Sequence, residues 1–158
     1  MHIFTKQQLQ KHLDESKIYY CYYHTPAGLL RIWSTDLGIY KTEFVEQEIM
    51  LPQYTLVDAI TPTQFVVVGT PFQIAVWQAA LTIPRGQTTS YKDLAQRIGK
   101  PTAFRAVANA LKINAIAYFI PCHRVLKANN DICGYNWGVE RKIKLLEAEE
   151  ITLHSKTS

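Results

Sequence analysis

The residue pattern of this 158-residue chain changes at Gly69, and that change restricts the fold more than any other feature. Before it, short runs of aromatic and β-branched residues predominate, including the tyrosine-rich segment 17–24. After it, apolar residues recur at helical spacing behind helix-capping residues. Strands in one half and helices in the other favour an α+β fold. We expect a small antiparallel sheet followed by a mostly helical domain.

The first half predicts one helix and four strands. Residues 6–15 have the spacing of a short surface helix that begins after Thr5. Strands are expected over 17–24, 29–34, 38–45 and 64–68, and residues 46–63 are interpreted as irregular. Nothing in this half is arranged for chemistry, so we interpret it as a scaffold.

The second half opens with strong helix-start signals. Thr70 is a suitable N-cap, Pro71 suits the first helical position, and Gln73 completes a capping box. The helix is apolar nearly all round, which is typical of a core helix, with Ile74, Trp77 and Leu81 on one face. A last helix is expected over about 139–150, with Ile143 and Leu146 toward the core and Glu149 at the edge of the apolar stripe.

Between these helices the sequence predicts two short helices joined by a turn. Ser90 is the expected N-cap of the first, Gly99 ends it, and Pro101 is expected to begin the second, which runs to about Lys112. Such a pair is typical of a helix-turn-helix. One side of the second helix is small, polar and basic and could approach a nucleic-acid groove: Arg105, Ala108, Asn109 and Lys112. This pattern alone leaves DNA binding and a purely structural role equally open.

The most reactive candidate is Cys122, which lies between Pro121 and His123. Proline restricts the backbone before the thiol, and a neighbouring imidazole can lower the pKa of a thiol and accept its proton. The alternative is a buried cysteine that packs as a small apolar side chain. The aromatic loop 134–138 follows, and aromatic faces can stack on bases. A groove-reading helix a dozen residues before a polarised cysteine suggests chemistry on an extruded base.

Charge and cysteine content further restrict the class of protein to which this chain can belong. The net charge of +4 permits a nucleic-acid partner without requiring one. Three cysteines without recurrent spacing argue against a disulfide framework and favour a reducing cytoplasm. Neither a zinc-binding pattern nor an apolar run of roughly 20 residues is present in the sequence, and its start does not resemble a signal peptide. We therefore expect a cytoplasmic protein without a metal or a membrane anchor.

Together these motifs resemble the O6-alkylguanine-DNA alkyltransferases, the methylated-DNA–protein-cysteine methyltransferases, most closely their Ada and Ogt branch. The resemblance is strong from about Gly69 to Glu149 and only architectural before that. It rests on Gly69-Thr70-Pro71-Phe72-Gln73, Tyr91, Leu94-Ala95, Arg105-Ala106-Val107, Asn114, Ile120-Pro121-Cys122-His123-Arg124-Val125, Gly134-Tyr135 and Trp137-Gly138.

The resemblance implies a ribonuclease-H-like scaffold domain over residues 1–68. It implies a DNA-binding alkyltransferase domain with a winged helix or helix-turn-helix over 69–152, and a flexible tail over 153–158. The implied activity is repair by direct reversal. The methyl or other alkyl group of O6-alkylguanine in double-stranded DNA, and that of O4-alkylthymine, moves irreversibly to the protein's own cysteine in one turnover. No cofactor, no membrane and no obligate protein partner are implied, and a monomer is expected.

The resemblance also implies a role for each matched residue. Cys122 accepts the alkyl group, His123 deprotonates it through a water, and Glu149 orients the histidine. Asn114 braces the active-site turn, and Tyr91 touches the base and its 3′ phosphate. The residues expected at the DNA are Arg105, which fills the gap left by the extruded nucleotide, with Ser90, Thr102, Ala103, Ala106, Asn109 and Arg124. The residues expected to line the substrate pocket are Tyr91, Leu111, Val125, Tyr135, Asn136 and Trp137.

Several positions depart from the family pattern. Phe104 is bulky on a helix face that is small in the family, Ala108 replaces a glycine, and Ala115 and Ala117 replace prolines. These changes bear on the affinity for DNA and on the range of substrates. They remove no side chain that the reaction needs. Two other functions stay open: a lesion sensor without transfer activity, which Cys122 argues against, and a helix-turn-helix regulator with a structural cysteine.

Overall fold

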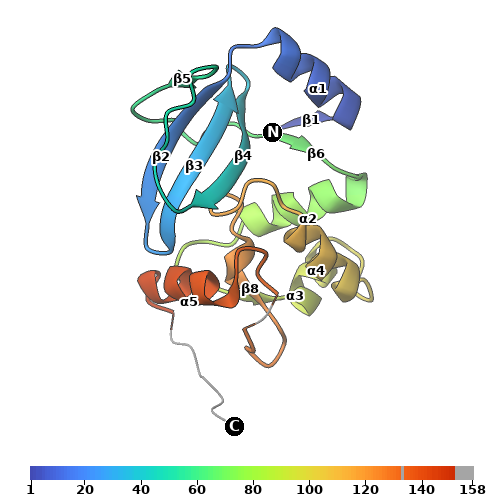
Figure 1. Ribbon diagram of the computed structural model, residues 1–158. Coiled ribbons are helices and arrows are strands. Elements are labelled where there is room, and N and C mark those ends of the chain that lie inside the picture. The colour runs from blue at the N-terminus through green and yellow to red at the C-terminus, as the bar shows by residue number, and fades with distance from the viewer. Residues whose placement is uncertain (133, 152–158) are drawn as a thin grey trace. The chain divides into compact units, whose positions relative to one another are not determined.

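A computed structural model of the chain describes residues 1–132 and 134–151 (Figure 1). The tail expected over 153–158 lies outside the described residues. The chain divides into two compact units, one formed by Met1–Thr70 with Ala115–Ala117 and the other by Pro71–Asn114 with the residues from Tyr118 onward. Helices and sheets occur in the arrangement that the sequence predicts, so the α+β class is confirmed. In the described ranges, no helix is both long and apolar enough to cross a membrane.

The first unit is built on a four-stranded sheet in the order β4-β3-β2-β5. Strands β2 (Tyr19–Thr25), β3 (Gly28–Thr35) and β4 (Gly38–Val45) are antiparallel neighbours, as predicted. Two pairings differ from the expected antiparallel sheet. The short strand β5 (Thr55–Leu56) joins β2 in parallel, and β1 (His2–Phe4) pairs in parallel with β6 (Val66–Val68). Strands β1 and β5, which are three and two residues long, were not predicted.

Local signals explain how two of these elements begin. The predicted helix is confirmed as α1 (Lys6–Glu15), and Thr5 and Gln8 form a capping box at its start. At the start of β4, Gly38 has φ +133°, and an added Cβ would lie 2.4 Å from the carbonyl oxygen of Gln64. Only glycine allows this close approach. It lets the backbone N–H of Ile39 donate to the same oxygen, 3.0 Å away, which attaches the chain before β6 to β4.

Residues 115–117 belong to the first unit although they follow the second unit's helices in sequence. Thr42 in β4 donates its backbone N–H to the carbonyl of Ala115 (2.9 Å) and its hydroxyl to the carbonyl of Ala117 (2.8 Å). Ile116 and Ala117 are buried. Tyr118 then has a positive φ of 79°, which turns the chain toward the Pro121-Cys122 segment. The segment before the candidate nucleophile is thus fixed by hydrogen bonds to a strand.

The second unit contains the helices α2 (Pro71–Leu81), α3 (Tyr91–Arg97), α4 (Phe104–Lys112) and α5 (Val139–Ala148). Strands β7 (Thr89–Ser90) and β8 (Val125–Leu126) pair in parallel, and the 3-10 turn η1 (Cys122–Arg124) precedes β8. All four predicted helices are confirmed. The third begins at Phe104 rather than Pro101, because residues 100–103 close a turn in which Ala103 N–H donates to the carbonyl of Lys100 (2.9 Å).

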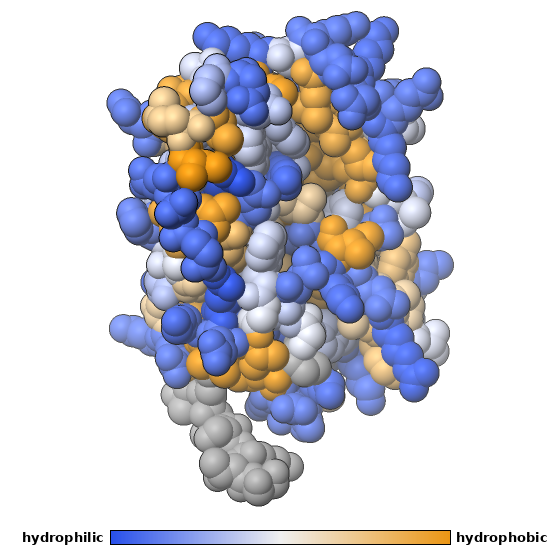
Figure 2. Space-filling model, in the orientation of Figure 1, coloured by the Kyte–Doolittle hydropathy of each residue, from blue (hydrophilic) through white to orange (hydrophobic). Residues whose placement is uncertain are grey.

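Apolar side chains of these helices form the unit's core. Leu94 and Ala95 of α3 are fully buried, as predicted, and so are Val76 and Ala80 of α2. Leu81, expected on the buried face of α2, is 37% exposed because it lies at the last turn of the helix. Figure 2 shows hydrophilic side chains over most of one face of the molecule, with separate apolar areas between them.

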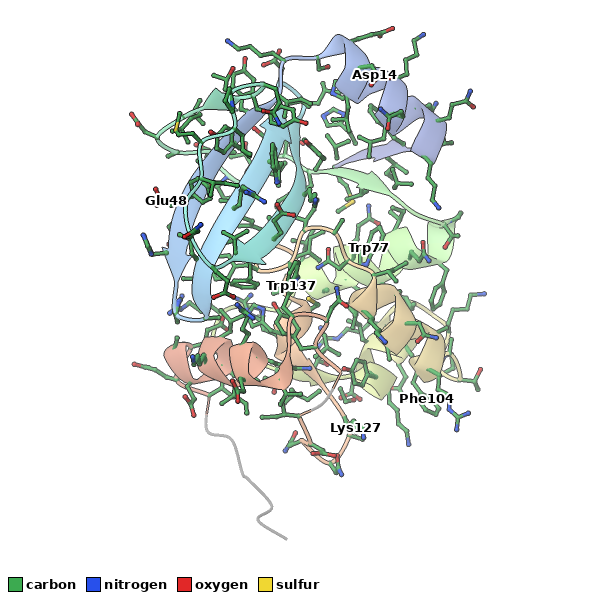
Figure 3. The ribbon with its side chains drawn as sticks, in the orientation of Figure 1. Asp14, Glu48, Trp77, Phe104, Lys127 and Trp137 are labelled. Carbon is green, nitrogen blue, oxygen red and sulfur yellow. The ribbon has the colours of Figure 1, made fainter. Side chains whose placement is uncertain are left out.

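The indole of Trp77, labelled on α2 in Figure 3, connects two of the helices. Its Nε1–H donates to the carbonyl of Ala110 in α4 (2.8 Å), and the bond is buried. Ala110 lies in the last turn of α4, where carbonyls have no partner within the helix. This hydrogen bond therefore satisfies a buried carbonyl and also sets the position of α4 against α2.

We predict that Trp77→Phe lowers the free energy of unfolding by about 1–3 kcal/mol, because the carbonyl of Ala110 loses its donor inside the core. Urea denaturation followed by circular dichroism measures this change. Leu81→Ala, at an exposed position of the same helix, serves as the control and is expected to change stability by no more than about 0.5 kcal/mol. Equal stability of Trp77→Phe and the wild type would contradict the role given to the hydrogen bond.

Candidate functional site

Cys122 begins the 3-10 turn η1 and its side chain is buried, with a relative exposure of 8%. The side-chain amide of Asn114 holds the turn in place. Its Nδ2 donates to the carbonyl of Ile120 (3.1 Å) and to Sγ of Cys122 (3.5 Å). Asn114, itself buried, therefore both braces the backbone before the cysteine and presents a dipole to the sulfur.

The next residue, His123, is paired with Glu149 at the C-terminal end of α5. Nε2 of His123 lies 3.0 Å from Oε1 of Glu149, and the two side chains are 1% and 7% exposed. A carboxylate can only accept, so Nε2 must carry the hydrogen, and in the neutral ring Nδ1 is left as an acceptor. Nδ1 is buried and has no hydrogen-bond partner among the described residues. Burial lowers the pKa of His123 more than Glu149 raises it, so the ring is neutral at pH 7.

Arg124 completes this ion cluster. Its Nε and Nη2 donate to the two carboxylate oxygens of Glu149 (2.9 Å each), and its Nη1 donates to the carbonyl of Ile83 (2.7 Å). The sequence analysis expected Arg124 at the DNA, whereas in the structure its guanidinium is bonded within the protein. Burial alone would raise the pKa of Glu149, but hydrogen bonds from His123 and Arg124 outweigh burial and lower it to about 2.

A buried lysine, which the sequence reasoning missed, lies at the same site. Lys142 of α5 is 1% exposed, and its Nζ donates to the carbonyl of Val125 (2.8 Å). The same Nζ lies 5.9 Å from the centre of the Tyr91 ring. One sequence signal could have revealed it. Lys142 lies three and four residues before the buried Leu145 and Leu146, on the apolar stripe of the helix.

These neighbours determine the state of the thiol. Burial raises the pKa of Cys122, while the hydrogen bond from Asn114 and the charge of Lys142 act in the opposite direction without overcoming it. The expectation that the adjacent imidazole lowers the thiol pKa is therefore wrong, because a neutral ring supplies no charge. With its pKa raised, the thiol of Cys122 carries its proton in the resting protein.

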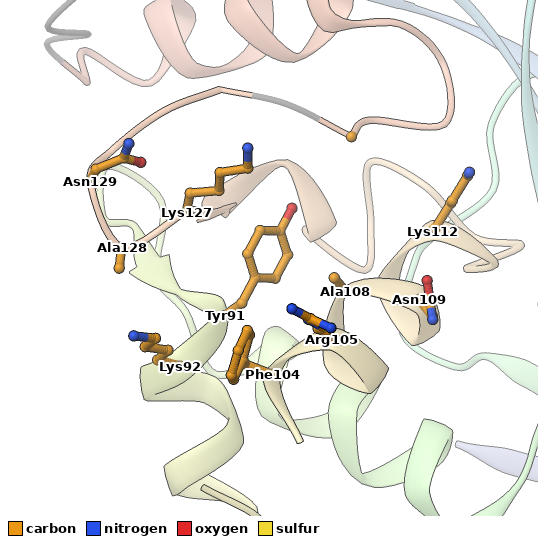
Figure 4. Close-up of a pocket in the computed structure, with 11 residues that line it drawn as sticks. Tyr91, Lys92, Phe104, Arg105, Ala108, Asn109, Lys112, Lys127, Ala128 and Asn129 are labelled. Atoms are coloured by element: carbon orange, nitrogen blue, oxygen red, sulfur yellow. The ribbon is translucent and has the colours of Figure 1, made fainter. Parts of the chain in front are cut away.

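A pocket of about 560 Å³ opens on the second unit (Figure 4). Tyr91 at the start of α3 and residues along one face of α4 form its walls, together with the segment after β8. Its lining residues carry four positive charges and no carboxylate. They are Tyr91, Lys92, Phe104, Arg105, Ala108, Asn109, Lys112, Lys127, Ala128, Asn129 and Gly134. The predicted polar face of α4 lies entirely in this pocket. Arg105 is exposed and has no hydrogen-bond or ion-pair partner among the described residues.

The other predicted contact residues lie elsewhere. Thr102 and Ala106 are exposed and Ala103 is half-buried, while Ser90 uses its hydroxyl to cap α3 by accepting from the N–H of Asp93 (3.0 Å). Of the residues expected to line the substrate pocket, only Tyr91 lines this one. Leu111, Val125 and Tyr135 are buried, Trp137 is half-buried and Asn136 is exposed.

Tyr135 lies close to the sulfur rather than to the pocket. Its hydroxyl is buried without a hydrogen-bond partner among the described residues. Burial, with a smaller contribution from Cys122, raises the pKa of Tyr135.

The pocket residues that sequence reasoning missed are Lys92, Lys127, Ala128, Asn129 and Gly134. Nothing in the spacing of these five residues could have shown that they share a pocket with α4. In the described ranges, the site included, no group of three His, Cys, Asp or Glu side chains could hold a metal ion.

The low pKa of Glu149 predicts how stability depends on pH. Because the folded pKa of about 2 lies below the unfolded value of 4.5, the stabilisation is complete above pH 4.5 and is lost as the pH falls from there toward 2. We expect Glu149→Gln to unfold at a lower temperature than the wild type at pH 7, and the difference to shrink as the pH falls toward 3. Thermal unfolding at several pH values tests this. A difference that does not depend on pH would contradict it.

The comparisons with known proteins match the half of the chain that contains this site. The family model described as "6-O-methylguanine DNA methyltransferase, DNA binding domain" matches residues 71–151. The Escherichia coli "Bifunctional transcriptional activator/DNA repair enzyme Ada" is 56% identical over 81 residues, which are 51% of this chain and 23% of that protein. A "Probable methylated-DNA--protein-cysteine methyltransferase" of Acanthamoeba polyphaga mimivirus is 54% identical over 82 residues, which are 52% of this chain and 54% of that protein.

A solved structure covers more of the chain. The Mycobacterium tuberculosis O6-methylguanine methyltransferase superimposes with a TM-score of 0.69 and 32% identity over 84% of this chain and 93% of that one. The curated relatives named above match over about half of their length or less. The family match covers the helices α2 to α5, the 3-10 turn with Cys122 and His123, and Glu149. The chain belongs to the 6-O-methylguanine DNA methyltransferase family.

Proposed function

We propose that this protein repairs DNA by transferring the alkyl group of O6-alkylguanine in double-stranded DNA to Sγ of Cys122. The observation that carries the proposal is a buried cysteine beside a neutral histidine whose Nδ1 is available and whose Nε2 is held by Glu149. Family membership supports it, because relatives that share this half of the chain are named methylated-DNA–protein-cysteine methyltransferases.

The transfer is a substitution at the alkyl carbon. As the thiol proton moves to Nδ1 of His123, through a bridging water, the sulfur forms a bond to the carbon and the bond between carbon and O6 breaks. Guanine leaves with the electron pair and takes up a proton from the phenol of Tyr91, which regains one from solvent. Glu149 stabilises the imidazolium that forms, and the charge of Lys142 and the amide of Asn114 stabilise the thiolate. The product is a thioether that water does not readily hydrolyse, so each molecule reacts once and needs no cofactor.

The DNA contact is assigned to α3 and α4 acting as a helix-turn-helix, with the segment after β8 as a wing. Four cations around the pocket suit a phosphate backbone, and aromatic Tyr91 in its wall suits a base. Because the alkylated base must leave the duplex to reach a buried sulfur, Arg105 is assigned to the gap that it leaves. Support comes from the 33% identical Mycobacterium tuberculosis OGT, whose structure was solved in complex with DNA.

Further parts of the proposal concern the whole protein. They are a ribonuclease-H-like first domain over 1–68, an alkyltransferase domain over 69–152, action on O4-alkylthymine, a monomeric state and a cytoplasmic location. The sensor and regulator alternatives are less favoured. A sensor does not need the arrangement of sulfur, imidazole and carboxylate, and a regulator does not explain a buried acceptor nitrogen next to a thiol.

We predict that wild-type protein mixed with a duplex containing O6-methylguanine gains the mass of one methyl group on Cys122. Cys122→Ala should gain none while still binding the duplex, since the pocket and α4 are unchanged. Cys21→Ala, which removes a buried cysteine of the first unit, is the control and should react normally. Intact-mass and peptide mass spectrometry make the measurement. Methyl uptake by Cys122→Ala would place the acceptor elsewhere, with Cys133, outside the described residues, as the next candidate.

We also predict that Arg105→Ala slows transfer from duplex DNA by at least about tenfold. Reaction with free O6-methylguanine should change less than about twofold, because a free base leaves no gap to fill. Single-turnover rates on both substrates give the ratio. Equal losses on both substrates would reduce Arg105 to a structural role or a simple phosphate contact.

A further inference from the structure

Phe104 is placed unusually for a phenylalanine. It is the first residue of α4, directly before Arg105, and it lines the basic pocket with its ring only half-buried. Phenylalanine is normally among the most buried residues, so a partly open ring in a pocket wall is an informative exception. Figure 4 shows the ring beside Arg105 and next to the base of the Tyr91 side chain.

Lys92 determines the electrostatic surroundings of this ring. Its Nζ lies 5.6 Å from the ring centre, and the side chain is exposed and lines the same pocket. A cation over an aromatic ring is attracted to its face and helps to hold the ring in place at the pocket wall. Arg105, Lys112 and Lys127 extend the positive charge along the pocket. Among the residues that the structure describes, only Lys127 of these three pairs with an acid, Asp131 at 3.7 Å.

An apolar face beside positive charges matches one ligand chemistry in particular. A nucleotide combines a flat π-system with a phosphate anion, and proteins bind unstacked nucleotides by pairing an aromatic side chain with a basic one. A bulky apolar residue next to an inserted arginine can also act as a wedge that keeps neighbouring bases apart. The position of Phe104, one residue before Arg105, fits both functions.

We propose that Phe104 and Lys92 form a second nucleotide subsite. In it the ring of Phe104 stacks on a base that borders the gap in the duplex, and Lys92 contacts the adjoining phosphate. The subsite takes any base, because every base has a π-face, and it opposes return of the extruded nucleotide. This inference rests on the proposed function, since it requires a duplex from which a nucleotide has been extruded.

The test compares binding to two duplexes of the same sequence, one with a single O6-methylguanine and one undamaged. Affinities are measured in the Cys122→Ala background so that binding is separate from transfer. Phe104→Ala should weaken binding to the damaged duplex by about 5- to 150-fold, the range for loss of one stacked base, and binding to the undamaged duplex by less than about twofold.

Two further substitutions separate stacking from packing. Phe104→Tyr keeps a flat ring and should bind the damaged duplex as tightly as the parent protein does. Phe104→Leu keeps apolar bulk without a ring and should bind as weakly as Phe104→Ala.

Lys92→Met should weaken binding to both duplexes and reduce the slope of log affinity against log salt by about 0.9, the value for one phosphate contact. Phe104→Ala should leave that slope unchanged.

Leu81→Ala, an exposed apolar position of the same unit outside the pocket, is the control and should match the parent protein. Thermal unfolding of each variant shows whether α4 still folds. Full binding by Phe104→Leu, or equal losses for Phe104→Ala on the two duplexes, would overturn the subsite. Failure of the wild type to take up a methyl group would instead refute the proposed function, so the two failures are distinguishable.

Discussion

The carboxylate of Glu149 is the interaction on which the arrangement of the site depends. It accepts hydrogen bonds from Nε2 of His123 and from two nitrogens of Arg124, which connects the end of α5 to the turn after Cys122. Arg124 in turn holds the carbonyl of Ile83, and the backbone N–H of Gly86 approaches Oε2 at 3.4 Å. A buried carboxylate is stable only when such donors surround it. The pairing also determines which nitrogen of His123 is free to accept a proton.

The charges around the sulfur suit a thiol that ionises only during reaction. Near Cys122 the described side chains include one anion, Glu149, and two cations, Arg124 and Lys142, while His123 is neutral. The cluster therefore has a net charge of one positive unit at rest, and it keeps this charge when the proton of the thiol moves to His123. Burial keeps the proton on the sulfur at rest, and a protonated thiol is less open to unspecific oxidation and alkylation than a thiolate.

Tyr91 connects this site to the pocket in which we propose that DNA binds. Tyr91 lines the pocket, and the centre of its ring also lies 5.9 Å from Nζ of Lys142. The capping of α3 by Ser90 places Tyr91 at the first turn of its helix, and the bond between Trp77 and Ala110 sets α4, which carries Phe104 and Arg105. Backbone capping and one buried hydrogen bond therefore position the side chains that face the proposed ligand.

The amino-acid sequence by itself determined the elements and the chemical groups. Capping residues and helical spacing predicted α1 to α5, aromatic and β-branched runs between turn signals predicted the three long strands, and the motif around Cys122 indicated a candidate nucleophile with its histidine. The tertiary structure alone decided the partners and the electrostatics. It paired Arg124 with Glu149, brought Lys142 near the thiol, put Lys127, Ala128, Asn129 and Gly134 in one pocket with α4, and attached residues 115–117 to β4. The reason is physical. The local residue pattern indicates which backbone conformation a segment prefers. The burial of a side chain, its pKa and its charged partners depend on residues that are distant in sequence and that only the folded chain brings together.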